Sequence, residues 1–425
     1  MILPALAHVL LPLIVAVSIL LMLFRPHGIA EVYWVGAGAL LLILLGLVPL
    51  RLAGRALAEG TDVYCFLFGM MLLSELAREH GVFDWLSSLA LRRARGSCLR
   101  LFTLVYAVGI IVTIFMSNDA TAVVLTPAIL HATRKARVAP LPCLFVCALI
   151  ANAASFVLPI SNPANLVVFH NRMPALAQWL LSFGVPSLLS ILATYAVMRW
   201  IFRKELRCTI EAEVEPQHLD TQGMLVIGGL AMVVAILLIA SALGMDLGLP
   251  TCLAALAVTA VVSIRARSNP WKLATEISWS TLALVAGLFI LVDAVESAGA
   301  LRLTGQALAW AQGLAPAVGA LVAALVVGVG NNLVNNLPLG LIAGGTLQAA
   351  HTNGLLADAV LIGVDLGPNL SITGSLATIL WLLALRKEGV ELSFWRFLRV
   401  GAVAMPIAMA LSVGSAIAMR MLFQG

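Results

Sequence analysis

The chain has 425 residues, of which 62% are hydrophobic and only 11% are charged. Soluble globular domains are about half apolar and about a quarter charged, so this composition excludes an ordinary soluble protein and indicates an integral membrane protein. The net charge of +5 does not indicate nucleic-acid binding, because the basic residues lie mostly in loops between apolar runs. These long solid runs predict membrane-spanning helices rather than β-barrel strands, which alternate over about ten residues.

Residues 1–202 are expected to contain five spans and one hairpin. The segment at 99–131 is broken at Ser117–Asp119 and has basic residues on both flanks. Because basic flanks on both ends of one crossing violate the positive-inside rule, we predict a re-entrant hairpin here. An amphipathic stretch, FDWLSSLALRR, precedes it. The predicted spans are 5–24, 31–50, 61–77, a broken helix at 142–171 and 175–202.

A polar connector at 203–221 carries the longest charged stretch and is expected to be a cytoplasmic linker. Residues 222–425 then repeat the order of the first half. The expected fold class is therefore an all-α polytopic membrane protein, with about ten spans that include two broken helices, and two re-entrant hairpins. The predicted elements are spans at 222–243, 247–264 and 280–297, a hairpin at 314–350, a broken helix at 355–385 and a span near 399–420.

Three sequence matches in the same order indicate that the two halves are copies. FGMMLLSELAREHG, which begins at Phe68, aligns with AGLFILVDAVESAG, which begins at Ala286, so the offset is 218. At an offset of 217, Asn118 falls on Asn335 and Asp119 falls on Asn336. Farther on, SNPAN is paired with GPNLS. Duplicated halves with paired helix breaks are the best sequence pointer to a secondary transporter.

The positions of the basic residues indicate that the two halves are inverted. If the second hairpin enters from the side opposite to the first, twenty of the 25 lysines and arginines lie on the cytoplasmic side. Both chain termini then lie outside, and none of these cations lies deep in the bilayer. This distribution is the one that the positive-inside rule favours.

Four polar interruptions are rich in asparagine, serine or threonine and have proline or glycine nearby, namely SNDAT, SNPAN, NNLVNNLP and GPNLSITGS. Interrupted backbone at membrane depth is tolerated only where it is buried in protein or lines a wet cavity. The amides can simply cap and join helices, but four clusters at matched places favour a polar pocket near the midplane. The expected binding residues are Ser117, Asn118, Asn162, Asn165, Asn335, Asn336, Asn369 and Thr373.

Four acidic residues lie in or beside apolar segments. A charged carboxylate near the bilayer centre costs on the order of 3 kcal/mol, so it must be protonated, paired or hydrated. We interpret Asp119, at the first hairpin tip, as the main proton-coupling residue or as a cation ligand. Glu75 and Asp293 are further proton-coupling candidates, with a position at the membrane interface as the alternative. Asp365 is interpreted as structural.

The six cysteines include no CxxC motif and predict no disulfide framework. Cys143 and Cys147 lie four residues apart, on one face of a helix. They are expected to be two small packing residues, with a dithiol as the alternative. The sequence predicts no metal site and no cofactor.

The motifs SNDATAVVLTP, SNPANLVVF, NNLVNNLP and GPNLSITGS make the chain resemble the ion-transporter superfamily, and most of all the bacterial arsenite efflux permeases of the ArsB type. The resemblance extends over nearly the whole chain. It implies an inner-membrane secondary transporter with two inverted repeats and elevator-like alternating access. It also implies export of arsenite and antimonite by proton antiport and, for some members, docking of an arsenical-stimulated ATPase. A homodimer is a further expectation.

The hairpin tips depart from the Ser-Asn-Thr signature of the dicarboxylate relatives. They read Ser117–Asn118–Asp119 and Asn335–Asn336–Leu337. An aspartate there repels citrate or succinate, and no lysine or arginine lies nearby in the sequence. At neutral pH arsenite is the uncharged triol As(OH)3, which amides and hydroxyls can hydrogen-bond without charge. Sodium–proton exchange and organic-anion transport remain the alternatives.

Two other protein classes fit the sequence less well. An intramembrane protease could use Asp119 with a second aspartate, but the sequence contains no GxGD, HExxH or GxSxG pattern. It also contains no P-loop, so the chain is not expected to hydrolyse ATP. A channel needs a continuous path, whereas two opposed hairpins that meet at mid-depth are more typical of gates around one site.

Overall fold

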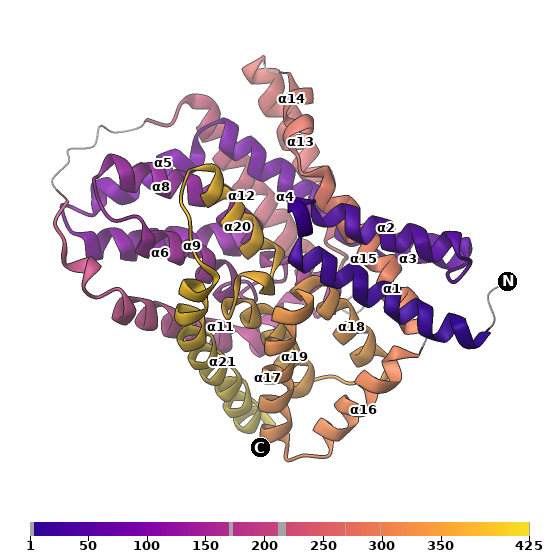
Figure 1. Ribbon diagram of the computed structural model, residues 1–425. Coiled ribbons are helices and arrows are strands. Elements are labelled where there is room, and N and C mark those ends of the chain that lie inside the picture. The colour runs from indigo at the N-terminus through magenta and orange to yellow at the C-terminus, as the bar shows by residue number, and fades with distance from the viewer. Residues whose placement is uncertain (1–3, 170–172, 211–217, 268, 298, 425) are drawn as a thin grey trace.

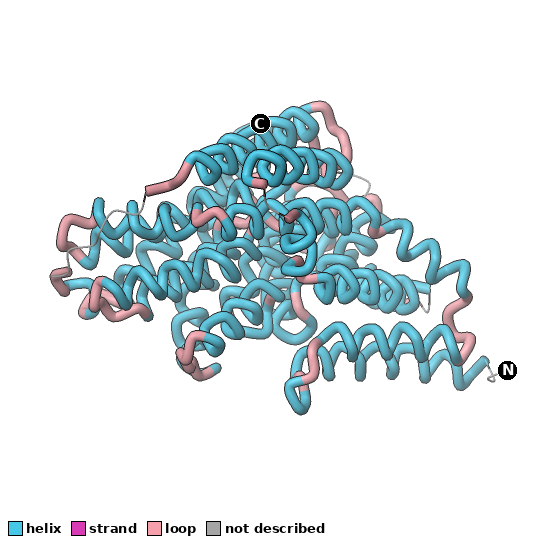
Figure 2. Tube along the Cα trace, turned by 90° about the horizontal axis from the view of Figure 1, so that it is seen from above, coloured by secondary structure: helices cyan, strands magenta, loops and turns pink. Residues whose placement is uncertain are grey.

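The computed structural model describes residues 4–169, 173–210, 218–267, 269–297 and 299–424. Helices are the regular elements of these residues, and their β pairing is limited to one isolated bridge between Ser97 and Thr209. Figure 2 shows the helices joined mostly by short loops. The predicted all-α polytopic fold is confirmed.

Seven helices in the described chain are long and apolar enough to cross a membrane, or eight if the bent pair α3 (Leu50–Glu59) and α4 (Thr61–Glu79) is one span. Two of the seven, α6 and α17, are the first arms of the predicted hairpins, and the broken helices consist of shorter pieces. The predicted ten crossings therefore stay a prediction. The seven are α6 (Cys98–Met116), α11 (Leu176–Ile201), α12 (Thr221–Ala242), α13 (Gly248–Ala266), α15 (Trp279–Ser297), α17 (Pro316–Val334) and α21 (Phe394–Gln424).

The predicted span at 31–50 is shorter than expected. Helix α2 (Glu31–Leu44) ends before Gly46, which adopts a φ of 68°, and Pro49 then precedes α3. A glycine with positive φ and a following proline are common helix stop signals. Helix α1 (Pro4–Phe24) runs beside α2 at one end of the molecule (Figure 1). At the opposite end lie α6, α5 (Val82–Arg93), α8 (Thr126–Lys135) and α9 (Leu141–Ala153).

Helices from the two halves pack on each other at close range. Helix α4 packs on α13, and α15 packs on α2. A Cβ atom added to Gly69 in α4 would lie 2.9 Å from the backbone of Thr251, and one added to Gly287 in α15 would lie 2.7 Å from the Val35 side chain. Small residues allow such close approach between membrane helices. The two glycines are related by the offset of 218, so both halves make the same kind of contact.

The order of helices in the first half recurs in the second. The offset of 218 also relates the starts of three successive pairs, namely α4 and α15, α5 (Val82–Arg93) and α16 (Ala300–Gln312), and α6 and α17. Helices α11 and α21 start at the same offset and pack along each other. The same apolar runs and breaks therefore build the same local elements twice.

Each hairpin turns at one residue with a positive φ. Ser117 ends α6 with a φ of 109°, and Asn335 ends α17 with a φ of 79°. Each also caps the next helix, because Ser117 Oγ accepts from the Ala120 N–H at 3.5 Å and Asn335 Oδ1 accepts from the Leu337 N–H at 3.4 Å. The second arms are α7 (Asn118–Ala120), a π-helical turn η2 (Thr121–Leu125) and α8 (Thr126–Lys135) in one hairpin, and α18 (Asn336–Ala349) in the other.

The equivalence of Ser117 and Asn335 changes the predicted alignment of the tips. The offset is 218 rather than 217, so Asn118 corresponds to Asn336 and Asp119 corresponds to Leu337. The second half therefore carries no acidic residue at this position. The hydroxyls of Thr113 and Thr121 lie 2.8 Å apart across the first hairpin, which fixes the return of its second arm.

The two broken helices are interrupted at equivalent points. Asn162 caps α10 (Pro163–Val168), and Ser375 caps α20 (Leu376–Lys387), both with extended backbone. SNPAN therefore corresponds to Gly374–Thr378 rather than to GPNLS, at an offset of 213. The preceding pieces are α9 (Leu141–Ala153) and η3 (Pro159–Ser161) in the first half, and α19 (Leu355–Leu366), η5 (Gly367–Asn369) and η6 (Ile372–Gly374) in the second.

The linker is attached to the start of the first hairpin. Around the Ser97–Thr209 bridge, the Cys98 N–H donates to the Cys208 carbonyl at 3.3 Å, and the Ile210 N–H donates to the Gly96 carbonyl at 2.8 Å. A disulfide joins Cys98 and Cys208, which are 110 residues apart in sequence. The prediction of no disulfide is wrong, because spacing carries no signal of this pairing. Residues 211–217 of the linker lie outside the described residues.

We predict that Asn335→Ala destabilises the protein in detergent by about 1–3 kcal/mol, because alanine is strained at positive φ and lacks the capping oxygen. Asn335→Gly loses only the cap and is expected to lose less stability. Thermal unfolding of the two variants beside the wild type measures the difference. Equal losses would contradict a positive φ as the constraint at this tip.

Candidate substrate site

The hairpin tips and the helix breaks pack into one region. Helix α7 and the turn η2 contact α9 and α20, while α18 contacts α10 and α17 contacts η5 and η6. Each hairpin therefore touches the broken helix of its own half and that of the other half. Two side chains bind the breaks to the first arms: Ser161 Oγ donates to the Ile114 carbonyl at 3.1 Å, and Thr373 Oγ1 donates to the Asn332 carbonyl at 2.9 Å.

A pair of buried polar contacts crosses between the two halves. Asn162 Nδ2 donates to Asp365 Oδ1 at 2.6 Å, and Asn162 Oδ1 accepts from the Ala164 N–H at 3.0 Å. At the offset of 213, Ser375 corresponds to Asn162 and Asn152 corresponds to Asp365. Ser375 Oγ lies 3.5 Å from Asn152 Oδ1. The same contact is therefore made twice, once to a carboxyl group and once to an amide.

Asp365 is fully buried in the described structure. Its Oδ2 atom has no partner at hydrogen-bond geometry, although Ser155 lies beside the carboxyl. No lysine or arginine of the described residues forms an ion pair with it. The sequence interpretation made Asp365 structural, but the bond to Asn162 joins it to a predicted binding residue. Nothing in the sequence indicated this bond, because the two residues are 203 positions apart.

Two of the predicted amides hold the breaks in shape. Asn165 Nδ2 donates to the Ser155 carbonyl at 2.9 Å, which closes the first break. Asn369 Nδ2 donates to the Leu149 carbonyl at 3.0 Å, and its Oδ1 accepts from Asn152 Nδ2 at 3.0 Å. Both polar atoms of the Asn369 side chain are therefore occupied by the protein. Sequence reasoning missed Asn152, which lies outside the quoted motifs.

Five buried side-chain oxygens at the tips and breaks accept no hydrogen bond at bonding geometry from the described residues. The orientation of two amides is fixed, because Asn331 Nδ2 and Asn165 Nδ2 both donate to backbone carbonyls. Among the described residues of these tips and breaks, no buried side-chain nitrogen lacks a hydrogen-bond partner. Buried polar atoms need partners, so this region is suited to a ligand that donates hydrogen bonds or carries positive charge. The five atoms are Asn118 Oδ1, Asn165 Oδ1, Asn331 Oδ1, Asn336 Oδ1 and Asp365 Oδ2.

Asp119 lies in the same region, next to Asn118 at the start of α7. Its side chain is partly exposed, and it forms no ion pair with the described lysines and arginines. The short helix that carries it contacts α9 and α20. The structure therefore places Asp119 beside Asn118, on a short helix that packs against the broken helices of both halves.

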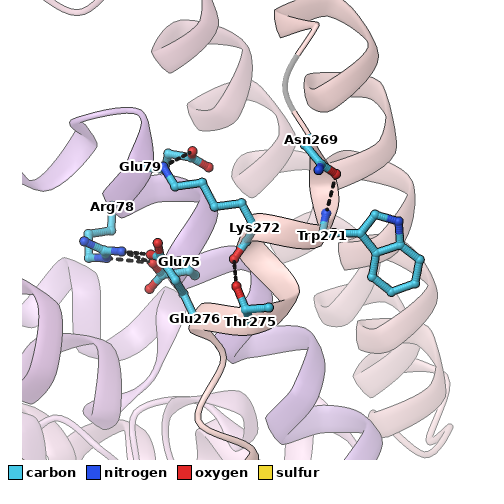
Figure 3. A network of polar contacts seen from close by, with 8 residues as sticks. All are labelled: Glu75, Arg78, Glu79, Asn269, Trp271, Lys272, Thr275 and Glu276. Atoms are coloured by element: carbon cyan, nitrogen blue, oxygen red, sulfur yellow. Dashed lines mark hydrogen bonds and ion pairs between the residues drawn. The ribbon is translucent and has the colours of Figure 1, made fainter.

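Glu75 lies elsewhere, in a network of charges at the end of α4 (Figure 3). Arg78 pairs with both Glu75 and Glu276, and Lys272 Nζ lies 3.1 Å from Glu79 Oε1. Glu79 raises the pKa of Lys272, which keeps this ammonium group charged. The network joins α4 to the short helix α14 (Pro270–Glu276). Its partners favour the interfacial alternative for Glu75.

Asp293 also lies apart from the amide region. It is partly exposed in α15, and the charged groups that interact with it include Glu59, Arg55 and Glu296. One of its oxygens, Oδ2, is buried without a hydrogen-bond partner among the described residues. Glu75 and Asp293 occupy matched positions in the two halves, but the groups around them differ.

A cavity of about 490 Å³ adjoins the outer ends of two site helices. It begins beside Val168 at the end of α10 and beside Gly344 in α18. Asp358 and Arg420 line it and form an ion pair at 3.9 Å. By the predicted topology this cavity opens to the outside. Sequence reasoning missed it, because its walls come from five separate helices.

Comparison with known proteins is consistent with this architecture. Residues 15–364 match the CitMHS family model, which is described as a citrate transporter. An arsenical pump membrane protein of Escherichia coli is 24% identical, over 96% of this chain and 98% of its own length. A protein of the same name from Yersinia enterocolitica is 24% identical over 92% and 94%, and an uncharacterized transporter of Mycobacterium bovis is 26% identical over 83% and 84%.

The crystal structure of the Alcanivorax borkumensis YdaH transporter is similar in fold. Its TM-score is 0.55 at 15% sequence identity, over 88% of this chain and 87% of the other. The family match covers most of the chain, and the relatives agree with the motif resemblance to the ArsB type. The chain therefore belongs to the CitMHS family, as a multi-pass transporter of the bacterial inner membrane that is similar to arsenical pump membrane proteins.

Proposed function

We propose that the chain exports trivalent arsenic and antimony from the cytoplasm, as the neutral hydroxides As(OH)3 and Sb(OH)3, in exchange for protons. The observation that carries this proposal is the set of five buried oxygens without hydrogen-bond donors at the tips and breaks. A neutral triol brings three hydroxyl donors and no charge, so it can donate to as many as three of these atoms. The names of the Escherichia coli and Yersinia enterocolitica relatives agree with this substrate.

A citrate or dicarboxylate anion fits the same region poorly. Its carboxylates would add acceptors to a region that already has unpaired acceptors, next to Asp119 and Asp365. No lysine or arginine of the described structure pairs with either aspartate to offset the repulsion. Burying an unpaired charge is costly. A sodium ion would be satisfied by the same oxygens, so sodium–proton exchange is the second candidate.

The predicted binding residues take two roles in this proposal. Asn118, Asn165 and Asn336 bind the hydroxide through their free oxygens, and Asn162 orients Asp365 beside them. The others keep the backbone of the tips and breaks in place through the contacts described above. This second group consists of Ser117, Asn335, Asn369 and Thr373.

We also propose that residues 1–202 and 222–425 are inverted repeats joined by the linker at 203–221. The hairpins and broken helices would move together as the transport part against α1–α4 and α12–α15, in an elevator-like exchange of access. The crossing contacts between Asn162 and Asp365 and between Ser375 and Asn152 support a single moving unit. The outer cavity beside α10 and α18 supports a release path. A homodimer and a separate ATPase partner are further proposals.

Asp119 is the proposed proton carrier. It is deprotonated while the site faces the cytoplasm and accepts the hydroxide among the amides. After the transport part has moved and the triol has left, Asp119 takes a proton from outside for the return. Its position at the hairpin tip, without an ion-pair partner among the described lysines and arginines, supports this role.

Transport in energised inside-out membrane vesicles tests the substrate. We expect arsenite to accumulate in the vesicles, and a protonophore to abolish the accumulation. Citrate and sodium are expected not to accumulate above the level of vesicles without the protein. Citrate accumulation without arsenite accumulation would contradict the proposal, and sodium accumulation coupled to proton release would favour the second candidate.

Asp119→Asn is expected to abolish proton-driven arsenite export while leaving the amount of protein in the membrane unchanged. The reason is that asparagine has nearly the same shape as aspartate but cannot bind and release a proton. Arsenite export against a gradient, measured in the same vesicles, checks this. Asp84→Asn is the matched control, because Asp84 is exposed on α5. Undiminished export by Asp119→Asn would exclude the coupling role.

Asp365→Asn is expected to fold normally, because Asn152 already occupies the equivalent place in the first half. The variant should raise the KM for arsenite about tenfold or more, since a hydrogen bond to a charged group contributes roughly 1.5–3 kcal/mol. Vesicle transport at varied arsenite concentration measures the KM. An unchanged KM would remove Asp365 from the substrate site.

A further inference from the structure

The six cysteines lie in three pairs, and one pair lies at the end of a membrane-spanning helix. Cys143 and Cys147 are buried one turn apart in α9, and Cys65 in α4 neighbours Cys252 in α13. The third pair, Cys98 and Cys208, joins the start of α6 to the linker, with Cα atoms 5.5 Å apart. By the predicted topology this pair faces the cytoplasm, where thiols are kept reduced and the disulfides that do form are usually transient.

The surroundings of this pair favour reactive thiols. Cys98 is buried as the first residue of α6, and Cys208 is exposed. A cavity of about 610 Å³ beside this helix start is lined by Leu89, Leu104 and four arginines that form no ion pair with the described residues. A helix N-terminus and neighbouring arginines both stabilise the thiolate. The arginines are Arg92, Arg93, Arg95 and Arg100.

We propose that the reduced Cys98–Cys208 pair is a binding site for trivalent arsenic or antimony on the cytoplasmic face. This site deepens the proposed function and rests on it for the orientation and the cargo. As(OH)3 forms two As–S bonds and loses two As–O bonds. The two thiol protons leave with the two hydroxides as water, and no atom is oxidised or reduced.

The backbone prearranges this site. The hydrogen bonds around the Ser97–Thr209 bridge already hold the two cysteines opposite each other, so little conformational freedom is lost on binding. Bound arsenic would link the linker to the first arm of the first hairpin, as the disulfide does. This role differs from that of the amide region, which binds the triol without covalent bonds and can release it. The thiol pair therefore acts as a cytoplasmic sensor or capture site rather than as the transport site.

Intact-mass measurement of the full-length protein tests this site, after reduction and removal of the reductant. Phenylarsine oxide is the probe, because its arsenic takes two thiols. We expect one arsenical adduct that depends on Cys98 and Cys208 and protects Cys208 from maleimide. Cys98→Ser/Cys208→Ser should lose this adduct, while Cys65→Ser/Cys252→Ser and Cys143→Ser/Cys147→Ser should keep it. Unreduced wild type should lack it and provides a control without any substitution.

The inference would be overturned if Cys98→Ser/Cys208→Ser kept the adduct. It would also be overturned if the arsenical did not protect Cys208 from maleimide in the reduced wild type. If the double variant folds poorly, the single variant Cys208→Ser, changed at an exposed position, gives the same test. If the protein exports arsenite in vesicles but forms no such adduct, the thiol site is excluded and the proposed function is retained. If the adduct forms but no arsenite is transported, the thiol site is retained and the proposed function is excluded.

Discussion

A helix interrupted inside a membrane must find hydrogen-bond partners for its broken ends within the protein, and the rest of this structure depends on that constraint. The chain meets it with asparagine, serine and threonine. Ser117 and Asn335 cap the returning arms of the hairpins, while Asn162 and Ser375 cap the second pieces of the broken helices. The caps come in equivalent pairs, and contacts such as Asn162–Asp365 and Ser375–Asn152 join the breaks of the two halves.

The polar interior that results is asymmetric, and its asymmetry bears on function. Asp365 in one half stands where Asn152 stands in the other, and Asp119 stands where Leu337 stands. Both acids therefore lie where the two otherwise equivalent halves differ. Their carboxylates and the unpaired amide oxygens make the region rich in acceptors. In the proposed function, this excess of acceptors favours a neutral, hydroxyl-bearing solute or a cation over an organic anion.

Much of the fold could be predicted from the sequence because long apolar runs and polar breaks report directly on the membrane. The predicted spans at 61–77 and 280–297 match helices closely. The register of the repeats could not be predicted as well, since short length differences moved the second break from an offset of 218 to 213. Partners far apart in sequence were also hidden, as the Asn162–Asp365 bond and the Cys98–Cys208 disulfide illustrate. Whether an acid is paired depends on such contacts, so Glu75 and Asp365 were the hardest residues to assign.

The most direct measurement of the central claim is a crystal structure of the full chain with bound arsenite, recorded at the arsenic absorption edge. The account predicts an anomalous peak between the start of α7, α10, α18 and the end of α19, within hydrogen-bonding distance of Asn118, Asn336 or Asp365. A second peak at Cys98 and Cys208 is compatible with the account. An occupied structure with no arsenic among the hairpin tips and helix breaks would contradict it.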